Sequence, residues 1–282
     1  MSPSWSEADV RSSTAWYDSP RHYDMVYEDY TKPETRFLEA MLRRHGPPAS
    51  GARRILEPAC GSGRLAESLS RRGHRVWGFD LNANQLAYAR ERLRRKGLRA
   101  TLWQDDLGGF DLPRGAGRFD LAHCLVSTFK YVLTEAEAAR HLRKVAAALR
   151  PGGLYVLGLH LTDYANPAPD HERWAARKGR THVVSDTWSA PANPRTRTEA
   201  MRTRMRIREG ERRWVTETEW TFRTYGPGQL RSLLRKAPAL ELVACHDFHY
   251  DATEARSLDL ASTDIVLVLR RGDGDLRRCG PR

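Results

Sequence analysis

The residues best suited to chemistry lie in one short segment, ILEPACGSGRLA, which covers residues 55–66. Gly61, Ser62 and Gly63 follow an apolar run and precede a helical pattern, and they match GxGxxG/A, a fingerprint of dinucleotide-binding loops. Asp80 ends the next apolar run, near the spacing expected for a ribose-binding acid. The loop alone therefore admits a nicotinamide dinucleotide. A Walker phosphate loop is excluded, because no Gly-Lys-Ser/Thr follows.

Glu57 comes before the glycines, at the end of the first apolar run. Its position argues against a dinucleotide as the cofactor. A carboxylate aimed at the loop disfavours a pyrophosphate and favours a cation. S-adenosylmethionine carries an ammonium and a sulfonium but no phosphate, and glycines let the backbone approach its amino-acid part closely. Cys60 in the same loop is interpreted as a passive thiol.

Composition restricts the classes of partner. The 282 residues carry a net charge of +12, which favours acidic partners such as nucleic acid. The basic excess is almost all arginine, which genomic base composition also explains, so we expect nucleic acid less than a small molecule. The chain has no apolar run of membrane-spanning length and its first residues are polar, which predicts a cytoplasmic protein without membrane contact. The four cysteines have neither disulfide-type nor zinc-type spacing, and we expect no metal.

The elements that must position these residues alternate between strand and helix. Asn82 is a good N-cap for a helix at 83–96, and Thr134 with Glu137 forms a capping box for a helix that runs to Leu149. Apolar runs predict five strands, at 55–59, 75–80, 99–104, 119–125 and 154–160. This rhythm predicts an α/β fold with a doubly wound, mostly parallel sheet.

After His160 the rhythm changes. Residues 162–182 are expected to form a long, partly helical loop, and an apolar–polar alternation from Met201 to Phe222 then predicts an antiparallel hairpin or small sheet. A helix at 226–237 and strands at 240–250 and 264–271 resume the α/β pattern.

The hairpin has a predicted register as well. A two-residue turn at 209–210 places Met205 opposite Trp214 and Arg202 opposite Glu217. One face is then apolar and the other charged. The expected division of the chain is a flexible start at 1–13, an α/β domain at 14–161 and 225–271, an inserted acceptor-covering subdomain at 162–224, and a disordered tail at 272–282.

In the order and spacing of its motifs the chain resembles the class I S-adenosylmethionine-dependent methyltransferases, from about Tyr17 to Arg270. LEPACGSGR matches the family's first motif, FDLNANQLAYAR its second, and QDDL the segment that contacts adenine. RPGG before the fifth strand is a common mark of the family. The layout is similar to small-molecule N-methyltransferases, which have a tyrosine-bearing N-terminal segment and an antiparallel insertion after strand five.

This resemblance implies a Rossmann-like sheet of seven strands whose last strand is antiparallel. It implies S-adenosylmethionine as cofactor and assigns Asp80 to the ribose hydroxyls. Asp106, rather than Asp105, is aligned as the acid near adenine. The implied cofactor contacts are Tyr17, Glu57, Ala59, Gly61, Gly63, Asp80, Leu81, Gln85, Asp106, Leu107 and Leu125.

The acceptor is less constrained. CLVSTF is similar to the CLGNSF of glycine-type N-methyltransferases but has Ser127 in place of asparagine, so acceptor identity does not transfer. His160 lies at the carboxyl edge of the sheet, where ligands bind, and is the candidate general base; a positioning or core role is the alternative. The remaining candidate acceptor contacts are Tyr23, Tyr27, Ser127, Glu217 and Glu219.

The sequence therefore predicts transfer of a methyl group to a nitrogen or oxygen of a small molecule. The alternatives are a methyltransferase that acts on RNA or protein and, further away, an NAD(P)-dependent oxidoreductase. The DPPY or NPPY motif of enzymes that methylate amino groups of nucleic acids is absent.

Overall fold

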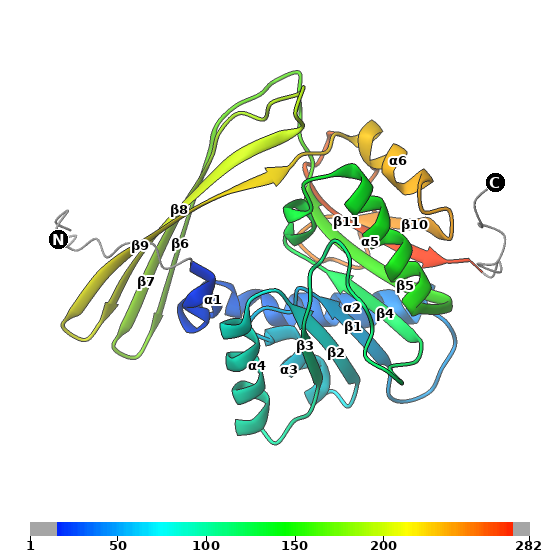
Figure 1. Ribbon diagram of the computed structural model, residues 1–282, viewed down its shortest axis with the longest axis horizontal. Helices are drawn as coiled ribbons and strands as arrows, with labels where there is room; N and C mark the ends of the chain where they lie inside the picture. The colour runs from blue at the N-terminus through cyan, green and yellow to red at the C-terminus, as the bar shows by residue number, and fades with distance from the viewer. Residues whose placement is uncertain (1–15, 273–282) are drawn as a thin grey trace.

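A sheet of seven strands forms the centre of the computed structural model, which describes residues 16–272 (Figure 1). Its strands are β1 (Arg54–Pro58), β2 (Arg75–Asp80), β3 (Thr101–Gln104), β4 (Phe119–Cys124), β5 (Leu149–His160), β10 (Leu240–His246) and β11 (Asp264–Arg271). They lie in the order β10-β11-β5-β4-β1-β2-β3. β11 runs antiparallel to β5 and β10, and the other pairs are parallel. The predicted fold class is confirmed.

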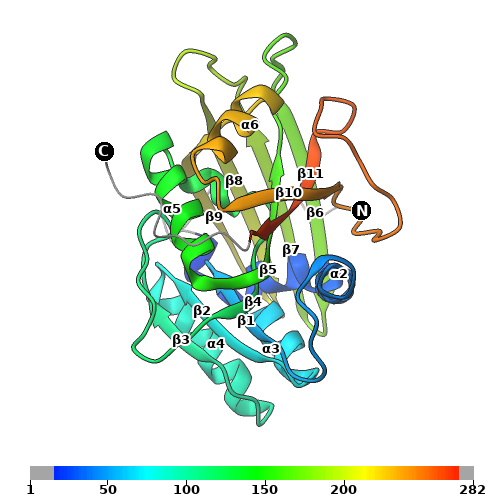
Figure 2. The same ribbon diagram turned by 90° about the vertical axis from the view of Figure 1, so that its right-hand side faces the viewer.

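Helices cover both faces of this sheet (Figure 2). α2 (Thr31–His45) and α3 (Arg64–Arg71) bury apolar side chains such as Phe37 and Leu69 against one face. α5 (Glu135–Ala148) and α6 (Pro227–Arg235) do so on the other face, with Leu142 and Leu230. Both faces are therefore dry, as a mostly parallel sheet requires.

The predicted helix starts are confirmed. Asn82 caps α4 (Ala83–Arg95), since its side-chain oxygen accepts hydrogen bonds from the N–H groups of Asn84 and Gln85. Thr134 caps α5, because its hydroxyl oxygen accepts from the N–H of Glu137 at 3.2 Å. These bonds satisfy N–H groups that a helix leaves open at its start.

A second sheet follows β5 and extends to one side of the central sheet (Figure 1). It is antiparallel, in the order β6 (Asp170–Lys178), β7 (Thr181–Ser189), β8 (Thr198–Glu209) and β9 (Arg212–Arg223). The insertion begins and ends at one place, where the N–H of Thr162 donates to the carbonyl of Tyr225 at 2.9 Å. The whole excursion is thus closed by a hydrogen bond between its two ends.

The loop predicted at 162–182 was wrong where β6 lies. β6 is the edge strand of the inserted sheet and is exposed over most of its length. Its side chains are therefore not required to alternate between apolar and polar, and its sequence lacks the pattern that predicts a strand. Its strand conformation comes from backbone hydrogen bonds to β7, which side-chain pattern does not encode.

The hairpin register was also wrong, by two residues. Glu209 pairs with Arg212, so the turn is formed by residues 210–211, and Met205 faces Thr216. Gly210 has a φ of +61°, the left-handed conformation that suits glycine at the first position of a tight hairpin turn. Because the error is even, every side chain of the hairpin stays on its predicted face.

The N-terminal segment lies between the inserted sheet and α4 (Figure 1). It consists of η2 (Trp16–Asp18), α1 (Pro20–Tyr27) and η3 (Glu28–Tyr30). Arg21 forms an ion pair with Glu209 on β8, and Glu28 forms one with Lys178 on β6. The flexible start at 1–13 and the tail from 273 lie outside the described residues. None of the helices within 16–272 has the length and apolarity needed to cross a membrane.

Candidate active site

The glycine loop connects β1 to α3 through a left-handed backbone. Ala59, Gly61 and Gly63 have φ values of +55°, +50° and +71°. A Cβ on Gly63 would lie only 2.8 Å from the Cβ of Ala89 on α4, so this glycine also allows α3 and α4 to approach. The loop is therefore held by packing as well as by conformation.

Glu57, next to the last residue of β1, lies beneath this loop and has one unsatisfied carboxylate oxygen. The residue is 6% exposed, and its Oε2 has no hydrogen-bond partner among the described residues. Burial raises the pKa of Glu57 to about 8, although the charge of Arg64 opposes the shift. A buried carboxylate oxygen of this kind is suited to a ligand that brings a cationic donor.

Asp80 ends β2 on the other side of the loop. Its Oδ2 accepts a hydrogen bond from the N–H of Gly61, and its Oδ1 accepts one from the N–H of Asn82, both at 2.8 Å. Burial raises its pKa, and these backbone hydrogen bonds lower it. Each carboxylate oxygen has further lone pairs, so Asp80 can fix the loop and still accept ligand hydroxyls. Leu81, the next residue, is 64% exposed.

Gln85 lies under the loop rather than on the exposed side of its helix. It is buried, and its Nε2 donates to the carbonyl of Tyr17 at 2.7 Å. Its Oε1 has no partner among the described residues and is 3.8 Å from the Cβ position of Gly61. The residue connects η2 to the glycine loop, a role that the sequence did not indicate.

The two neighbouring aspartates after β3 differ in their surroundings. The carboxylate of Asp105 accepts hydrogen bonds from the N–H groups of Asp106 and Asp111 and so shapes the turn. Asp106 is exposed, and its Oδ1 accepts from the N–H of Gly108. This difference favours Asp106 as the ligand-facing acid. Leu107 is half-buried, and Leu125 is buried behind the loop after β4.

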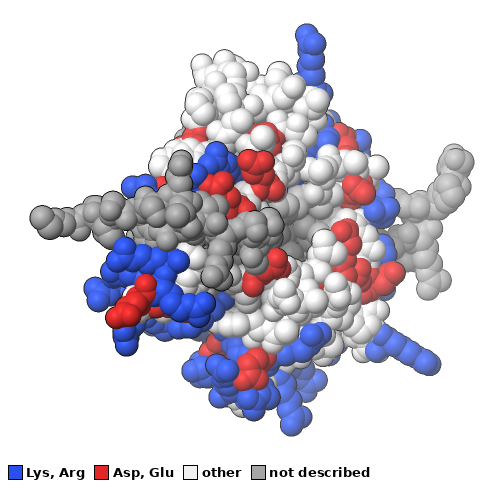
Figure 3. Space-filling view, turned by 60° about the vertical axis from the view of Figure 1, so that its left-hand side comes forward, with Lys and Arg blue, Asp and Glu red and all other residues white. Residues whose placement is uncertain are grey.

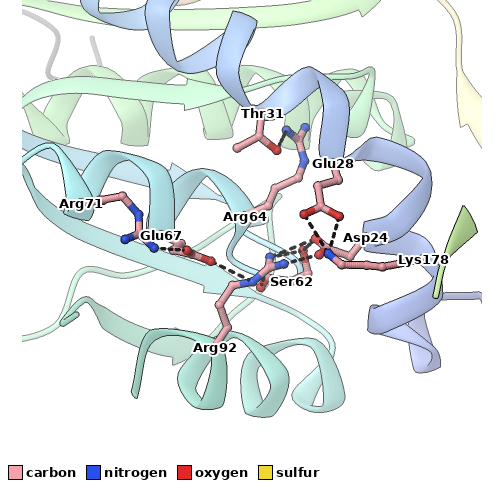
Figure 4. Close-up of polar contacts among 9 residues, drawn as sticks. All are labelled: Asp24, Glu28, Thr31, Ser62, Arg64, Glu67, Arg71, Arg92 and Lys178. Carbon is pink, nitrogen blue, oxygen red and sulfur yellow. Dashed lines mark hydrogen bonds and ion pairs between the residues drawn. The ribbon is translucent and has the colours of Figure 1, made fainter. Parts of the chain in front are cut away.

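Polar contacts join the N-terminal helices to the glycine loop and to α3 and α4, and Figure 4 shows those of Asp24 with Ser62 and Arg92. Arg64, the first residue of α3, pairs with Glu34 of α2, whose side chain is fully buried. Ser62 in the loop donates to Asp24 of α1 at 2.7 Å, and Asp24 pairs with Arg92 of α4. The buried carboxylates of Glu34 and Asp24 thus each have an opposite charge beside them.

Cys60 is a packing residue. It is buried, and a Cβ placed on Gly78 of β2 would lie 3.1 Å from its Sγ. Burial and the charges of Glu57 and Asp80 raise the pKa of this thiol well above its ordinary value. It is therefore a poor nucleophile, in line with the passive role predicted for it.

A cavity of about 890 Å³ lies between the carboxyl edge of the central sheet, the N-terminal tyrosines and one face of the inserted sheet. Of the residues that the sequence singled out, it is lined by Tyr17, Tyr23, Tyr27, Ser127 and His160. The inserted sheet adds large apolar side chains, among them Trp174, Met201, Trp220 and Phe222. This volume suits a small-molecule acceptor.

The tyrosines form one continuous aromatic wall. The ring centres of Tyr17 and Tyr23 are 5.6 Å apart, and those of Tyr23 and Tyr27 are 4.7 Å apart. The hydroxyls of Tyr17 and Tyr131 form a hydrogen bond. Burial raises the pKa of Tyr23 to about 12 and the pKa values of Tyr17 and Tyr27 well above 10, so the wall is uncharged at neutral pH.

The turn after β4 is strained beside the cavity. Val126 and Ser127 both have left-handed φ values, of +55° and +61°, which non-glycine residues seldom adopt. The Ser127 hydroxyl accepts a hydrogen bond from the N–H of His160 at 3.0 Å. Ser127 therefore joins the ends of β4 and β5, and the strain is concentrated where a ligand would lie.

His160 has a carboxylate partner that the sequence did not predict. Its Nδ1 lies 2.5 Å from Oδ1 of Asp264, the first residue of β11, and its ring packs edge-on against Phe248. Its Nε2 makes no hydrogen bond within residues 16–272, and both residues line the cavity. Only the pairing of β11 with β5 brings Asp264 into register with His160.

Lys130 and Glu199 form a second unpredicted pair in the cavity. Lys130 is 3% exposed, and its Nζ lies 2.6 Å from the Glu199 carboxylate on β8. The ammonium also lies 5.1 Å from the centre of the Phe222 ring. The sequence signal was a lone lysine in a short apolar segment of an arginine-rich chain.

Glu217 and Glu219, the two carboxylates predicted to contact the acceptor, lie on the opposite face of β9. Trp220 and Phe222 face the cavity, so strand alternation directs both glutamates away from it. Glu217 instead pairs with Arg202 and Arg204, and these charges lower its pKa. We no longer assign either glutamate to the acceptor.

The described residues contain no group of three or more His, Cys, Asp or Glu side chains arranged to hold a metal ion. Cys60, Cys124 and Cys245 are free and buried.

The strand order with an antiparallel β11, the glycine loop after β1 and the acid after β2 together define a class I methyltransferase fold. The resemblance drawn from the sequence is thereby confirmed. Residues 55–153 match the family model described as a methyltransferase domain.

Curated relatives align with about half of the chain. A dTDP-3-amino-3,6-dideoxy-alpha-D-glucopyranose N,N-dimethyltransferase from Streptomyces fradiae is 33% identical over 139 residues, which are 48% of this chain and 50% of the relative. Glycine N-methyltransferase from Rattus norvegicus is 32% identical over 45% of each chain. The chain spans about half the length of the curated relatives it matches.

Solved structures extend the likeness of fold to nearly the whole chain. A methyltransferase from Clostridium acetobutylicum covers 92% of this chain and 99% of its own, with a TM-score of 0.71 and 18% identity. DesVI from Streptomyces venezuelae covers 90% of this chain and 98% of its own, with a TM-score of 0.70 and 18% identity. At this identity the likeness shows the fold alone.

Proposed function

We propose that the protein is an S-adenosylmethionine-dependent methyltransferase that methylates a nitrogen atom of a small-molecule amine. The observation that carries the proposal is Glu57, a buried carboxylate with one unpartnered oxygen beneath a left-handed glycine loop. A pyrophosphate at this position would face Glu57 and Asp80, whereas the ammonium of an amino acid would neutralise the former. A cytoplasmic location stays a prediction.

The residues around the loop fit the cofactor. Glu57 would accept a hydrogen bond from the cofactor's ammonium, and Asp80 has lone pairs that could accept hydrogen bonds from the ribose hydroxyls. The exposed Asp106 and Leu81 are proposed to flank the adenine. When bound, the cofactor supplies a methyl group that its sulfonium already makes electrophilic.

The protein's part in the reaction is to position the acceptor, exclude water and accept a proton. The inserted sheet and the tyrosine wall enclose the acceptor against the carboxyl edge of the central sheet. Asp264 holds Nδ1 of His160 and leaves Nε2 for the acceptor. His160 can then take a proton from the acceptor's ammonium group, and the resulting neutral amine attacks the methyl group. Asp264 acts through His160 and is a positioning residue.

Nitrogen is favoured over oxygen because relatives named as N-methyltransferases recur in the comparison, among them amino-sugar N,N-dimethyltransferases. An amine is also a better nucleophile than a hydroxyl. Amino sugars are therefore the first acceptors to test.

Two measurements test the proposal. Titration calorimetry should detect S-adenosylmethionine binding that Asp80→Ala weakens strongly, with no comparable binding of NADH. Labelled S-adenosylmethionine should then transfer its methyl to an amine in a panel of amino sugars, simple amines, phenols and bulk RNA. Binding of NADH alone would overturn the cofactor assignment, and transfer only to phenols or RNA would overturn the acceptor assignment.

A further inference from the structure

The acceptor cavity has the opposite charge to the rest of the protein. The chain carries +12 overall, and the face in Figure 3 presents several clusters of basic side chains. The cavity lining instead contains seven carboxylates and one lysine. Because a surplus of one sign of charge along a cavity creates a local potential, the cavity attracts cations although the surface attracts anions.

Three of these carboxylates are neutralised by an arginine or a lysine: Glu34 by Arg64, Glu199 by Lys130 and Asp247 by Arg256. A fourth, Asp264, is hydrogen-bonded to His160. The other three, Asp163, Asp170 and Glu172, form no ion pair with any residue between 16 and 272. Asp163 and Asp170 each accept a hydrogen bond from a nearby backbone N–H, so Glu172 of β6 is the carboxylate best placed for a ligand.

Glu172 lies in a setting that is suited to an ammonium group. The Trp174 Nε1–H donates to Glu172 at 3.3 Å, and the Trp174 ring meets the Tyr30 ring edge-on with centres 5.6 Å apart. Burial, and then the charge of Glu172, raises the pKa of Tyr30. We name Glu172, Trp174 and Tyr30 the rim box; all three line the cavity.

Building on the proposed function, we propose that the acceptor has a second ammonium group, which binds in the rim box, and that it bears no phosphate. Aromatic faces attract a cation, and an adjacent carboxylate adds a charge-assisted hydrogen bond. The rim box is built from β6 and η3, whereas His160 ends β5. We assign the methylated nitrogen to the side of His160 and the second ammonium to the rim box. A phosphate would be repelled by the surplus of carboxylates, which disfavours a nucleotide-linked sugar in this cavity.

Three sugars that differ at one position test this proposal. They are 2,6-diamino-2,6-dideoxyglucose, glucosamine and glucosamine 6-phosphate, which place an ammonium, a hydroxyl and a phosphate on C6. We expect kcat/KM to be at least about tenfold higher for the diamine than for glucosamine, and lowest for the phosphate. Equal values for the diamine and glucosamine, or a preference for the phosphate, would overturn the proposal.

The variant Glu172→Gln should remove the preference for the diamine by raising its KM, with little change for glucosamine. Glu211→Gln is the matched control, since it removes the same charge at the exposed hairpin tip and should keep the preference. An unchanged preference in Glu172→Gln would contradict the rim box. Calorimetry with S-adenosylmethionine is run alongside: loss of cofactor binding is a failure of the proposed function, whereas intact binding without transfer to any of the three sugars refutes the acceptor proposal alone.

Discussion

Asp264 lies directly across from His160, on the antiparallel strand β11, with its Oδ1 2.5 Å from the histidine Nδ1. The hydrogen bond holds Nδ1 and leaves Nε2 without a hydrogen-bond partner among residues 16–272. In the proposed reaction this nitrogen accepts the proton. A carboxylate behind a histidine both orients the ring and stabilises its charged form.

Asp264→Asn is expected to lower kcat by about tenfold or more, because asparagine cannot stabilise a charged His160. KM for the acceptor and Kd for the cofactor should change little. Asp264→Glu should recover part of the rate. The double variant with His160→Gln should be no slower than His160→Gln alone, and additive losses in steady-state kinetics would contradict action through the histidine.

Glu57→Gln is expected to weaken cofactor binding by about tenfold or more while stabilising the free protein at alkaline pH. Glu57 takes up a proton on folding, because its pKa rises from 4.5 to about 8. Wild-type stability therefore falls as pH rises through this window, by at most about 1.4 kcal/mol per unit. Thermal denaturation of the two proteins should diverge from pH 5 to 8 and then keep a constant gap.

Cofactor affinity should have a matching pH dependence. Binding of an ammonium requires ionised Glu57, so wild-type affinity should rise as the pH approaches 8, and it should fall again where the ligand's ammonium loses its own proton. Glu57→Gln should lack this rise. Calorimetry at pH 6, 7 and 8.5 checks the difference, and parallel slopes in the two proteins would argue against contact with Glu57.

Gly63→Ala is expected to destabilise the protein more than Gly73→Ala. Both glycines have left-handed φ values, +71° and +87°, so both substitutions cost about 1–2 kcal/mol from backbone conformation. Only the Cβ at Gly63 meets another atom, Ala89 Cβ at 2.8 Å. Equal losses in urea denaturation would mean that α3 and α4 can separate without cost.

Arg64→Met is expected to cost about 3–5 kcal/mol, because it leaves the fully buried Glu34 without its opposite charge. Adding Glu34→Gln should restore much of this loss. Chemical denaturation of both variants checks the pair. If the second substitution restored nothing, the contribution of Arg64 would come from packing alone.

The central sheet was predictable because its helices and strands carry local signals. Asn82 and Thr134 are capping residues that mark where helices begin. Buried parallel strands are recognisable because their apolar residues form continuous runs. The glycine loop and Asp80 were predictable for the same reason, since motif spacing within one βαβ unit fixes their proximity. The prediction failed at β6, an edge strand that packs too little to leave a pattern.

The acceptor side depended on contacts between distant segments. Asp264 meets His160 only through the register of β11, and Lys130 meets Glu199 only because β8 lies over the cavity. Glu217 and Glu219 were placed on the correct side of their strand, but a single sequence does not say which side of an inserted sheet faces the protein. The residue types at the hairpin tip are compatible with a turn at residues 209–210 or at residues 210–211. The predicted register was wrong because the turn lies at 210–211.

The hydrogen bond between Thr162 and Tyr225 makes residues 162–225 an exchangeable cassette. Because the segment leaves and re-enters the domain at one point, a different insertion could be grafted there without moving the strands that hold the glycine loop. Acceptor preference can then diversify while the cofactor half is conserved. Any such exchange must preserve the ion pairs of Arg21 and Glu28, through which the N-terminal segment binds the inserted sheet.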